Sequence, residues 1–141
     1  MKFGVFDHVD RGATSLAELY ESRLKLAEIY DRSGFYAYHI AEHHSTPLGF
    51  APSPGIFLSA VAQRTKRLRF GPMVYLLPFY HPIRLIEEIC MLDQLSDGRL
   101  ELGIGRGVSL LGGLAAGGCL GIWAIYYFGA KLRARSRFAQ G

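Results

Sequence analysis

Hydrophobic and polar positions along residues 1–109 follow a pattern that repeats three times. Each repeat begins with a short, nearly continuous apolar run and continues with a longer segment in which apolar residues recur at helical spacing. A fourth apolar run follows the third repeat, and the four runs cover residues 2–6, 35–40, 68–77 and 99–104. Strands that are apolar throughout are typical of a parallel sheet covered by helices. The pattern therefore predicts an α/β fold in which strand and helix alternate three times before a fourth strand.

Local signals mark where the helices begin and end. Ser15 and Glu18 have the spacing of a capping box, and Gly34 is a typical helix stop. Ser53 and Pro54 form a good N-cap and first-turn pair. These signals predict one helix in each repeat, and the third of them begins at Pro82.

The repeat is roughly thirty residues long, which is the usual size of a strand–helix–strand unit. Both a (β/α)8 barrel and an open doubly wound sheet are built from such units. No Gly-x-Gly-x-x-Gly sequence follows the first apolar run, which argues against an open sheet that binds a dinucleotide. We therefore expect an α/β fold of the (β/α)8 TIM-barrel type, with only the first four strands present, that is, a partial barrel.

Unusual polar residues gather where the predicted strands end. These are Asp7, His8, residues 42–44, His81 and Arg106. In a (β/α)8 barrel the carboxyl ends of the strands meet at one face, where such enzymes carry out their reactions. The alternatives are structural: Asp7 or His8 can close a loop, and His81 can bond a backbone carbonyl. Four strands would each bring polar groups to this one face, and this convergence favours a reaction site there.

The sequence Ala-Glu-His-His-Ser at residues 41–45 lies at the centre of this group. Successive strand side chains point to opposite faces, so Glu42 and His44 share one side and His43 lies on the other. In a barrel, only one of these two histidines would look into the mouth. No Glu-x-x-His or His-x-His spacing accompanies them, so we predict no metal site here.

Arg106 lies between Gly105 and Gly107 at the end of the fourth predicted strand. Two glycines let the backbone approach a ligand closely, and a guanidinium can grip a phosphate with its fork of donors. The alternative is an ion pair between Arg106 and a carboxylate of a neighbouring loop. The residues alone leave both interpretations open.

Composition narrows the class of protein. The 141 residues are half hydrophobic and one fifth charged, which is enough for one domain with a core and excludes a disordered chain. The net charge of +4 is mild and the basic residues do not share a helix face with aromatics, so we expect no nucleic-acid binding. Cys90 and Cys119 lack metal-ligand spacing, and we predict that Cys90 is a small core residue. With no signal-peptide pattern at the start, these features indicate a reducing cytoplasm.

Residues 107–130 break the pattern, because they contain seven glycines and no charged residue. Their length meets the criterion for a membrane span, although so many glycines make a poor autonomous helix. A shifted or truncated reading frame and an ordinary buried helix are the other interpretations. We therefore divide the chain into residues 1–109 and an atypical Gly/Ala/Leu-rich segment with a basic tail at residues 110–141.

Taken together, the motifs resemble those of the bacterial luciferase-like flavin monooxygenases over residues 1–109. Each motif alone is weak, whereas their combination, order and spacing are specific. The matching sequences are Met-Lys-Phe-Gly at 1–4, Ala-Glu-His-His at 41–44, Leu-Leu-Pro at 76–78, His-Pro at 81–82, Leu-Asp-Gln-Leu-Ser-Asp-Gly-Arg at 92–99 and Leu-Gly-Ile-Gly-Arg-Gly at 102–107.

The resemblance implies a monooxygenase that binds reduced FMN at the carboxyl-terminal face of the barrel. With O2 it would oxidise an aldehyde or another small organic substrate, and a flavin reductase would supply the reduced flavin. Some relatives use the deazaflavin F420 instead. His43 matches the histidine that members place beside the flavin for the chemistry, and Arg106 matches an arginine that reaches the flavin phosphate. Residues 73–75 cover the place of a strained peptide bond under the flavin ring. The other implied cofactor-binding residues are Glu42, Met73, Val74 and Gly105.

The chain departs from this family in its length. Such barrels need about 250 residues, whereas the pattern here ends after four strands. Half a barrel leaves two open sheet edges and an uncovered core, which pairing with another half would cover in a homo- or hetero-oligomer. Two other hypotheses stay open: a non-catalytic partner subunit, and a membrane-associated remnant of the same family held by residues 107–130.

Overall fold

The computed structural model of the chain describes residues 1–44, 46 and 48–107. These residues belong to two compact units. The first comprises Met1–Tyr75 and Leu92–Ile104, and the second comprises Leu76–Met91 and the described part of Gly105–Gly141. The predicted boundary at residue 109 and the apolar segment with its basic tail lie outside the described residues.

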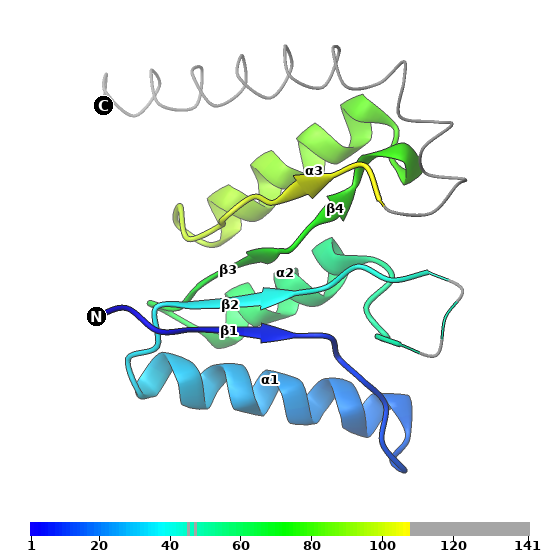
Figure 1. Ribbon diagram of the computed structural model, residues 1–141. Helices are drawn as coiled ribbons and strands as arrows, with labels where there is room; N and C mark the ends of the chain where they lie inside the picture. Colours follow the sequence, from blue (N-terminus) through cyan, green and yellow to red (C-terminus); the bar gives the residue numbers. More distant parts are fainter. Residues whose placement is uncertain (45, 47, 108–141) are drawn as a thin grey trace, which may run out of the picture. The chain divides into compact units, whose positions relative to one another are not determined.

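The first unit contains a parallel sheet (Figure 1). The chain passes through β1 (Gly4–Asp7), α1 (Leu16–Arg32), β2 (Ala37–Ile40), α2 (Pro54–Arg64) and β3 (Arg69–Pro72). The strands pair in the order β1-β2-β3, with Gly4 opposite Ala37 and Ala37 opposite Arg69. The predicted alternation of parallel strands and helices is therefore confirmed, whereas the partial (β/α)8 barrel with only its first four strands stays a prediction.

The predicted capping box is present at the start of α1. The Ser15 hydroxyl accepts from the Glu18 N–H at 3.3 Å, and the Glu18 carboxylate accepts from the Ser15 N–H at 2.9 Å. These two bonds satisfy N–H groups that a helix start leaves without intrahelical partners. Gly34, with φ of +78°, follows the end of α1 and confirms the predicted stop. Ser53 is the N-cap of α2, but its side chain makes no capping bond.

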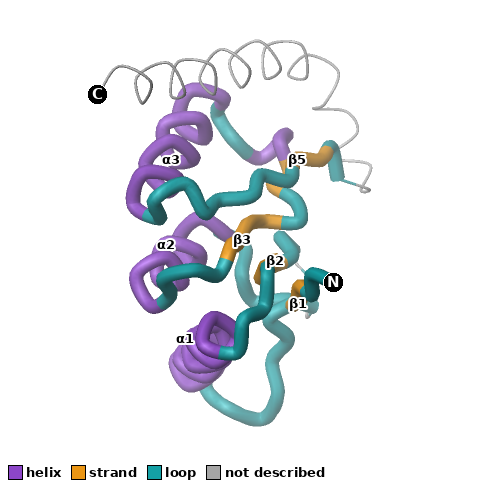
Figure 2. The backbone as a smooth tube through the Cα atoms, turned by 90° about the vertical axis from the view of Figure 1, so that its left-hand side faces the viewer, coloured by secondary structure: helices purple, strands orange, loops and turns teal. Residues whose placement is uncertain are grey.

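Helices α1 and α2 lie along one face of the sheet (Figure 2). Alternation along the strands directs Tyr38, Ile40 and Phe70 to this face, where all three are fully buried. They form a hydrophobic core with Leu58 and Val61 of α2. Burial of each such side chain stabilises the fold by about 1.5–3 kcal/mol, so this core holds the sheet against the helices.

The opposite face of the sheet carries a charged cluster. The Arg69 Nε donates to one oxygen of Glu101 at 2.6 Å, and the His39 Nε2 lies 3.1 Å from the other oxygen. Partial burial by itself raises the pKa of Glu101, but the hydrogen bond and charge of Arg69, with the charge of His39, bring this pKa below its ordinary value. Phe6 lies opposite His39 in the sheet, so its side chain is on the same face, and Phe6 is 47% exposed.

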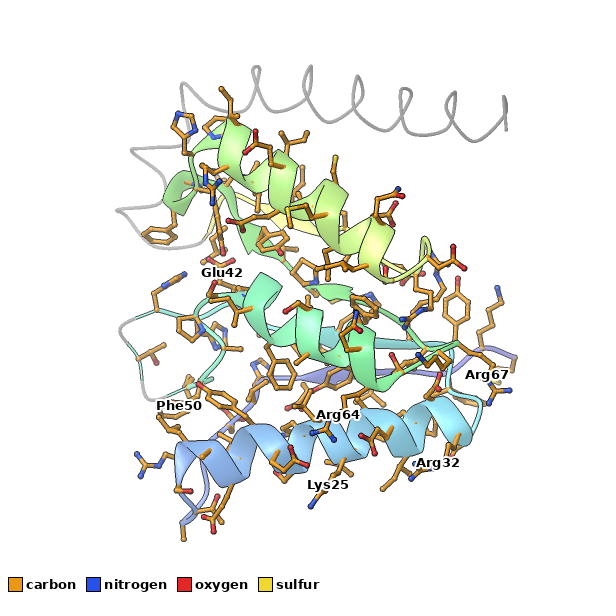
Figure 3. The ribbon with its side chains drawn as sticks, turned by 180° about the vertical axis from the view of Figure 1, so that it is seen from behind. Lys25, Arg32, Glu42, Phe50, Arg64 and Arg67 are labelled. Atoms are coloured by element: carbon orange, nitrogen blue, oxygen red, sulfur yellow. The ribbon has the colours of Figure 1, made fainter. Side chains whose placement is uncertain are left out.

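Polar contacts at the amino-terminal end of β3 fix its start against α1. The carboxylate of Asp31 accepts from three consecutive N–H groups, those of Lys66, Arg67 and Leu68, at 3.1, 2.8 and 2.6 Å. Burial by itself raises the pKa of Asp31, but these three bonds and the charge of Arg67 lower it below its ordinary value. Nearby, Arg64 (labelled in Figure 3) links α2 to α1 through the carboxylates of Glu21 and Glu28, each at 2.7 Å.

The third apolar run forms two strands, so the single strand predicted over residues 68–77 is wrong. β3 ends at Pro72, and β4 (Tyr75–Leu76) begins after the Met73–Val74 peptide bond, which is cis. Pro72 still pairs with Ile40 of β2, but it has no N–H to donate on its other side, where the Phe70 N–H donates to the Arg99 carbonyl. A 3-10 helix, η1 (Leu77–Phe79), follows β4.

The fourth strand is also shorter than predicted over residues 99–104. Leu100 makes a single parallel bridge with Phe70, and β5 (Ile104–Gly105) pairs with β4. The backbones approach very closely here, because a side-chain carbon on Gly71 would collide with the Glu101 backbone. The absence of an N–H on Pro72 limits the pairing further.

Helix α3 (Pro82–Leu95) begins at Pro82, as predicted. Its buried residues Leu85, Ile89 and Leu92 recur at the spacing of one helical face. Cys90 is exposed, so the prediction that it is a core residue is wrong. The reason is geometric, since Cys90 lies about 100° around the helix from Ile89.

Replacing Leu58 by alanine should destabilise the first unit by about 2–5 kcal/mol, because the substitution leaves a cavity in the core. Ile56→Ala is the matched control on the same helix, since Ile56 is 74% exposed. It should change the free energy of unfolding by less than about 0.5 kcal/mol. Urea unfolding followed by circular dichroism measures both values. Equal losses in the two variants would contradict the orientation of α2.

Candidate functional site

The carboxyl ends of β1, β2 and β3 lie side by side at one edge of the sheet (Figure 1). Just beyond the strands, the Ala41 N–H donates to the Asp7 carbonyl at 3.0 Å, and the Met73 N–H donates to the Ile40 carbonyl at 2.8 Å. These bonds bring together the segments around Asp7, His43 and Met73. Each of the three contains residues that the sequence analysis singles out as site candidates. We refer to this region as the strand-end edge.

His43 is half-buried at this edge and its ring has a defined orientation. Its Nδ1 lies 3.0 Å from the carbonyl oxygen of Leu48. A carbonyl can only accept, so Nδ1 carries the proton in this bond, and Nε2 is then the acceptor nitrogen of the neutral ring. His43 can therefore take up a proton at Nε2 while Nδ1 holds the ring in place. Its role as the catalytic residue stays a prediction.

Glu42 and His44 share the other side of this segment. The Glu42 side chain is 0% exposed, and its Oε1 accepts from the His44 Nε2 at 2.6 Å. Figure 3 labels Glu42 near the end of β2. A buried carboxylate needs partners that replace water, and His44 is one of them. The assignment of Glu42 to a cofactor site stays a prediction.

Asp7 organises the end of β1. Its Oδ1 accepts from the Val9 N–H at 2.7 Å, its Oδ2 accepts from the Tyr38 hydroxyl at 2.7 Å, and Oδ2 also lies 3.0 Å from the Arg23 Nε. Burial raises the pKa of Tyr38 well above its ordinary value, and the charge of Asp7 and its hydrogen bond add to the rise. The Tyr38 hydroxyl is thus kept protonated as a donor to Asp7.

Phe6 and His8 join the site through ring contacts. The rings of His8 and His43 are stacked, with centroids 5.3 Å apart and planes inclined by 25°. Phe6 meets the His8 ring edge-on at 4.8 Å. The family resemblance implicates neither residue, and the sequence indicates His8 only as one of several polar residues at strand ends. Their spacing of two residues, which puts both side chains on one face of a strand, was the available signal.

The Met73–Val74 peptide bond is cis, and it lies where the resemblance implied an unusual peptide bond. This bond directly follows β3, and Met73 is 49% exposed. The assignment of Met73 and Val74 to a cofactor site stays a prediction.

Gly105, Arg106 and Gly107 belong to the second unit as described. Gly105 is the last residue of β5, the Arg106 side chain is exposed, and Gly107 has φ of +76°. The positive φ at Gly107 favours glycine, and an exposed guanidinium is available to an anion. The assignment of Arg106 and Gly105 to phosphate and cofactor binding stays a prediction.

Within residues 1–44, 46 and 48–107, no group of three or more histidine, cysteine, aspartate or glutamate side chains could hold a metal ion. In the same part of the chain, none of the helices is both long enough and apolar enough to cross a membrane.

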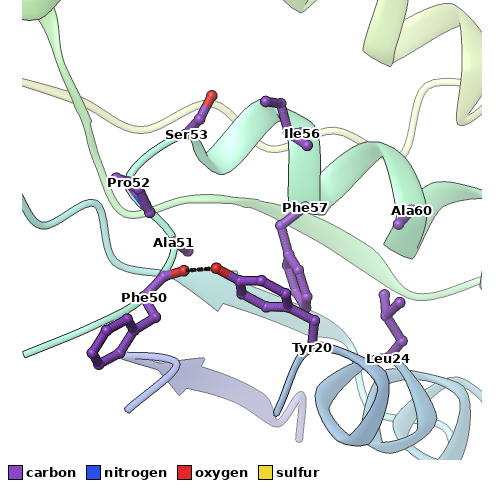
Figure 4. Close-up of a pocket in the computed structure, with 9 residues that line it drawn as sticks. All are labelled: Tyr20, Leu24, Phe50, Ala51, Pro52, Ser53, Ile56, Phe57 and Ala60. Atoms are coloured by element: carbon purple, nitrogen blue, oxygen red, sulfur yellow. Dashed lines mark hydrogen bonds between the residues drawn. The ribbon is translucent and has the colours of Figure 1, made fainter. Parts of the chain in front are cut away.

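A separate apolar pocket of about 340 Å³ lies between α1, α2 and residues 50–53 (Figure 4). Tyr20, Phe50, Ile56 and Phe57 are among its lining residues. The Tyr20 hydroxyl donates to the Phe50 carbonyl at 2.6 Å and is therefore already engaged. The pocket has no acid, imidazole or amine in its lining, so it offers none of the proton-transfer groups that the strand-end edge provides.

Residues 1–111 match the model of the family described as luciferase-like monooxygenase. This match covers most of the chain, and the chain belongs to the luciferase-like monooxygenase family. The expectation drawn from the strand-end motifs is thereby confirmed for the family.

Individual relatives agree with this assignment. The chain is 62% identical over 107 residues to the protein y4wF of Sinorhizobium fredii, covering 76% of this chain and 31% of that protein. It is 38% identical over 109 residues to the oxygenase component of the flavin-dependent trigonelline monooxygenase of Acinetobacter baylyi, covering 76% of this chain and 30% of that protein.

A solved structure is similar as well. It is the oxygenating constituent of 3,6-diketocamphane monooxygenase from Pseudomonas putida, a type II Baeyer–Villiger monooxygenase in complex with FMN. The TM-score is 0.74 and the identity is 33%, over 83% of this chain and 33% of that chain. The present chain thus spans about a third of the length of the relatives it matches.

Asp7→Asn should lower the free energy of unfolding by about 1–3 kcal/mol, because it removes the charge that Arg23 and two hydrogen-bond donors share. Tyr38→Phe should cost only about 0.5–1.5 kcal/mol, since Asp7 keeps its other two partners. Urea unfolding of both single variants and the double variant gives the coupling energy between Asp7 and Tyr38. A coupling energy of zero would show that the Asp7–Tyr38 bond does not stabilise the end of β1.

Proposed function

We propose that this chain supplies the first part of a flavin-dependent monooxygenase, which acts with reduced FMN and O2 on an aldehyde or another small organic substrate. The observation that carries the proposal is the placement of His43 at the strand-end edge, with its Nδ1 held by the Leu48 carbonyl and its Nε2 left as acceptor. The fold of the complete protein would be a (β/α)8 barrel, in which this edge is part of the reaction face.

The side chains at the strand-end edge have the chemistry that a flavin requires. The flavin ring is planar, with apolar faces and polar edges. Phe6 and Met73 offer exposed apolar surface, and His43 offers a polar ring nitrogen. In the second unit, Arg106 has a donor fork of the kind that binds a phosphate in two places. The FMN bound to the similar Pseudomonas putida enzyme supports FMN as the cofactor, and F420 is the alternative.

The protein residues would bind and orient the cofactor and move a proton, while reduced flavin supplies the electrons for oxygen activation. Apolar side chains such as Phe6 and Met73 would exclude water from the reacting atoms. His43 would take up or release a proton at Nε2, because its Nδ1 is engaged with the Leu48 carbonyl.

The rest of the enzyme and its reductant would come from partners or from further polypeptide. The name "oxygenase component" of the Acinetobacter relative supports a separate flavin reductase as the source of reduced flavin. Phe6 and Met73 are exposed apolar residues at the strand-end edge, which favours coverage by further barrel strands in a homo- or hetero-oligomer. The same observation favours a second candidate function, that of a non-catalytic partner subunit.

Titration of the 141-residue chain with FMN, followed by flavin fluorescence, tests the proposal. We expect saturable binding with a Kd of about 1–100 μM. Arg106→Gln should weaken FMN binding about tenfold or more, because it removes a charge-assisted bond to the phosphate. The same substitution should leave riboflavin binding unchanged, since riboflavin has no phosphate.

Arg84→Gln is the matched control, because Arg84 is an exposed arginine of the same unit as Arg106. It should leave the binding of both flavins unchanged. Folded protein that shows no saturable FMN binding would contradict catalytic competence and favour the partner-subunit function. Equal weakening of FMN and riboflavin by Arg106→Gln would contradict the phosphate role of Arg106.

A further inference from the structure

Three rings follow one another at the strand-end edge. Phe6 lies edge-on to His8 at 4.8 Å, and His8 is stacked on His43 at 5.3 Å with an interplanar angle of 25°. Phe6 and His8 come from β1 and its extension, whereas His43 follows β2. The His8 ring therefore covers one face of the imidazole whose Nδ1 bonds the Leu48 carbonyl.

The direction of the His8 side chain is set by the backbone that follows it. Val9 is completely buried and has φ of +54°, a conformation that is uncommon for a β-branched residue. The Asp7 carboxylate accepts from the Val9 N–H at 2.7 Å and stabilises this turn. The Val9 carbonyl in turn accepts from the Phe50 N–H at 3.0 Å. His8 is thus held between two anchored neighbours.

Gly49 joins the His8 and His43 segments. Its N–H donates to the Asp10 carboxylate at 3.1 Å, and its φ is +78°. A side-chain carbon at this position would lie 2.7 Å from the His8 carbonyl oxygen and 2.8 Å from the His43 Nδ1. Only glycine therefore lets the loop close around both residues, and this closure places the Leu48 carbonyl within reach of the His43 ring.

From this geometry we infer that His8 is a positioning residue for His43. Its stacked ring keeps the His43 imidazole from rotating away from the Leu48 carbonyl. The contact thereby maintains the proton on Nδ1 and presents Nε2 as the acceptor. The use of Nε2 in flavin chemistry rests on the proposed function, whereas the effect of His8 on the His43 ring does not.

The stacked arrangement distinguishes this role from shared metal binding. Two imidazoles that bind one ion direct a nitrogen lone pair of each ring toward it, in the plane of each ring. The His8 and His43 rings instead face each other with their planes inclined by 25°. Contact through the ring faces constrains orientation and supplies no common ligand position.

The experiment measures the tautomer of His43 directly by NMR in the full chain, labelled with ¹⁵N in the histidine rings. Long-range ¹H–¹⁵N correlation spectra at mildly alkaline pH, where imidazole is neutral, show which ring nitrogen carries the proton. The spectrum of His43→Gln identifies the His43 signals among the five histidines. No flavin is present, so the result is independent of the proposed function.

His8→Phe and His8→Leu form the matched pair of variants, because both are apolar and only phenylalanine keeps a ring. In the wild-type protein and in His8→Phe, the Nδ1-protonated form of His43 should predominate. In His8→Leu it should become the minor form, and the Nε2-protonated form that histidine prefers in water should predominate. Circular dichroism confirms that both variants fold, as expected for substitution of an exposed side chain.

Two outcomes overturn the inference. A wild-type tautomer in His8→Leu would show that the stacked ring does not position His43. Loss of the Nδ1-protonated form in both variants would show that ring stacking is not the cause. Failure of FMN to bind in the titration above would leave this result unaffected and would count only against the proposed function.

Discussion

Parallel pairing of β1, β2 and β3 is the constraint on which the rest of the structure depends. It places the carboxyl ends of the strands at one edge, so that residues from distant parts of the chain lie next to each other. The core formed with α1 and α2 holds this arrangement from one side. The Asp31 contacts at the start of β3 and the Asp7 contacts at the end of β1 then fix the two ends of the sheet.

Opposite environments on the two sides of residues 42–44 follow directly from this pairing. Glu42 is buried with His44 as a partner. The ring of the neighbouring His43 instead stacks on His8, which in turn contacts Phe6 edge-on. One side of the segment is therefore a buried carboxylate paired with His44, and the other side carries an imidazole held by ring stacking and by the Leu48 carbonyl. The separation explains how three consecutive ionisable residues can be accommodated at a strand end.

Much of the local structure could be predicted from the sequence, because its causes are local. The capping box at Ser15, the stop at Gly34 and the start of α3 at Pro82 depend on neighbouring residues alone. The two sides of residues 42–44 follow from the alternation of strand side chains.

The errors arise where the outcome depends on contacts between distant segments. The single strand expected over residues 68–77 is divided after Pro72, where the backbones of Gly71 and Glu101 approach closely. Cys90 is a small residue within an apolar helical pattern, which is typical of a core position, but it lies outside the buried face of α3. The stacking of His8 on His43 requires a loop closed at Gly49, which no local pattern specifies.

On the family assignment and the site geometry, we propose that a flavin binds this chain at the strand-end edge. Backbone amide NMR of the ¹⁵N-labelled chain during FMN addition locates the binding surface. We expect the largest chemical-shift changes at residues 6–8, 41–44 and 73–74. Largest changes at Tyr20, Ile56 and Phe57, which line the apolar pocket between α1 and α2, would contradict it.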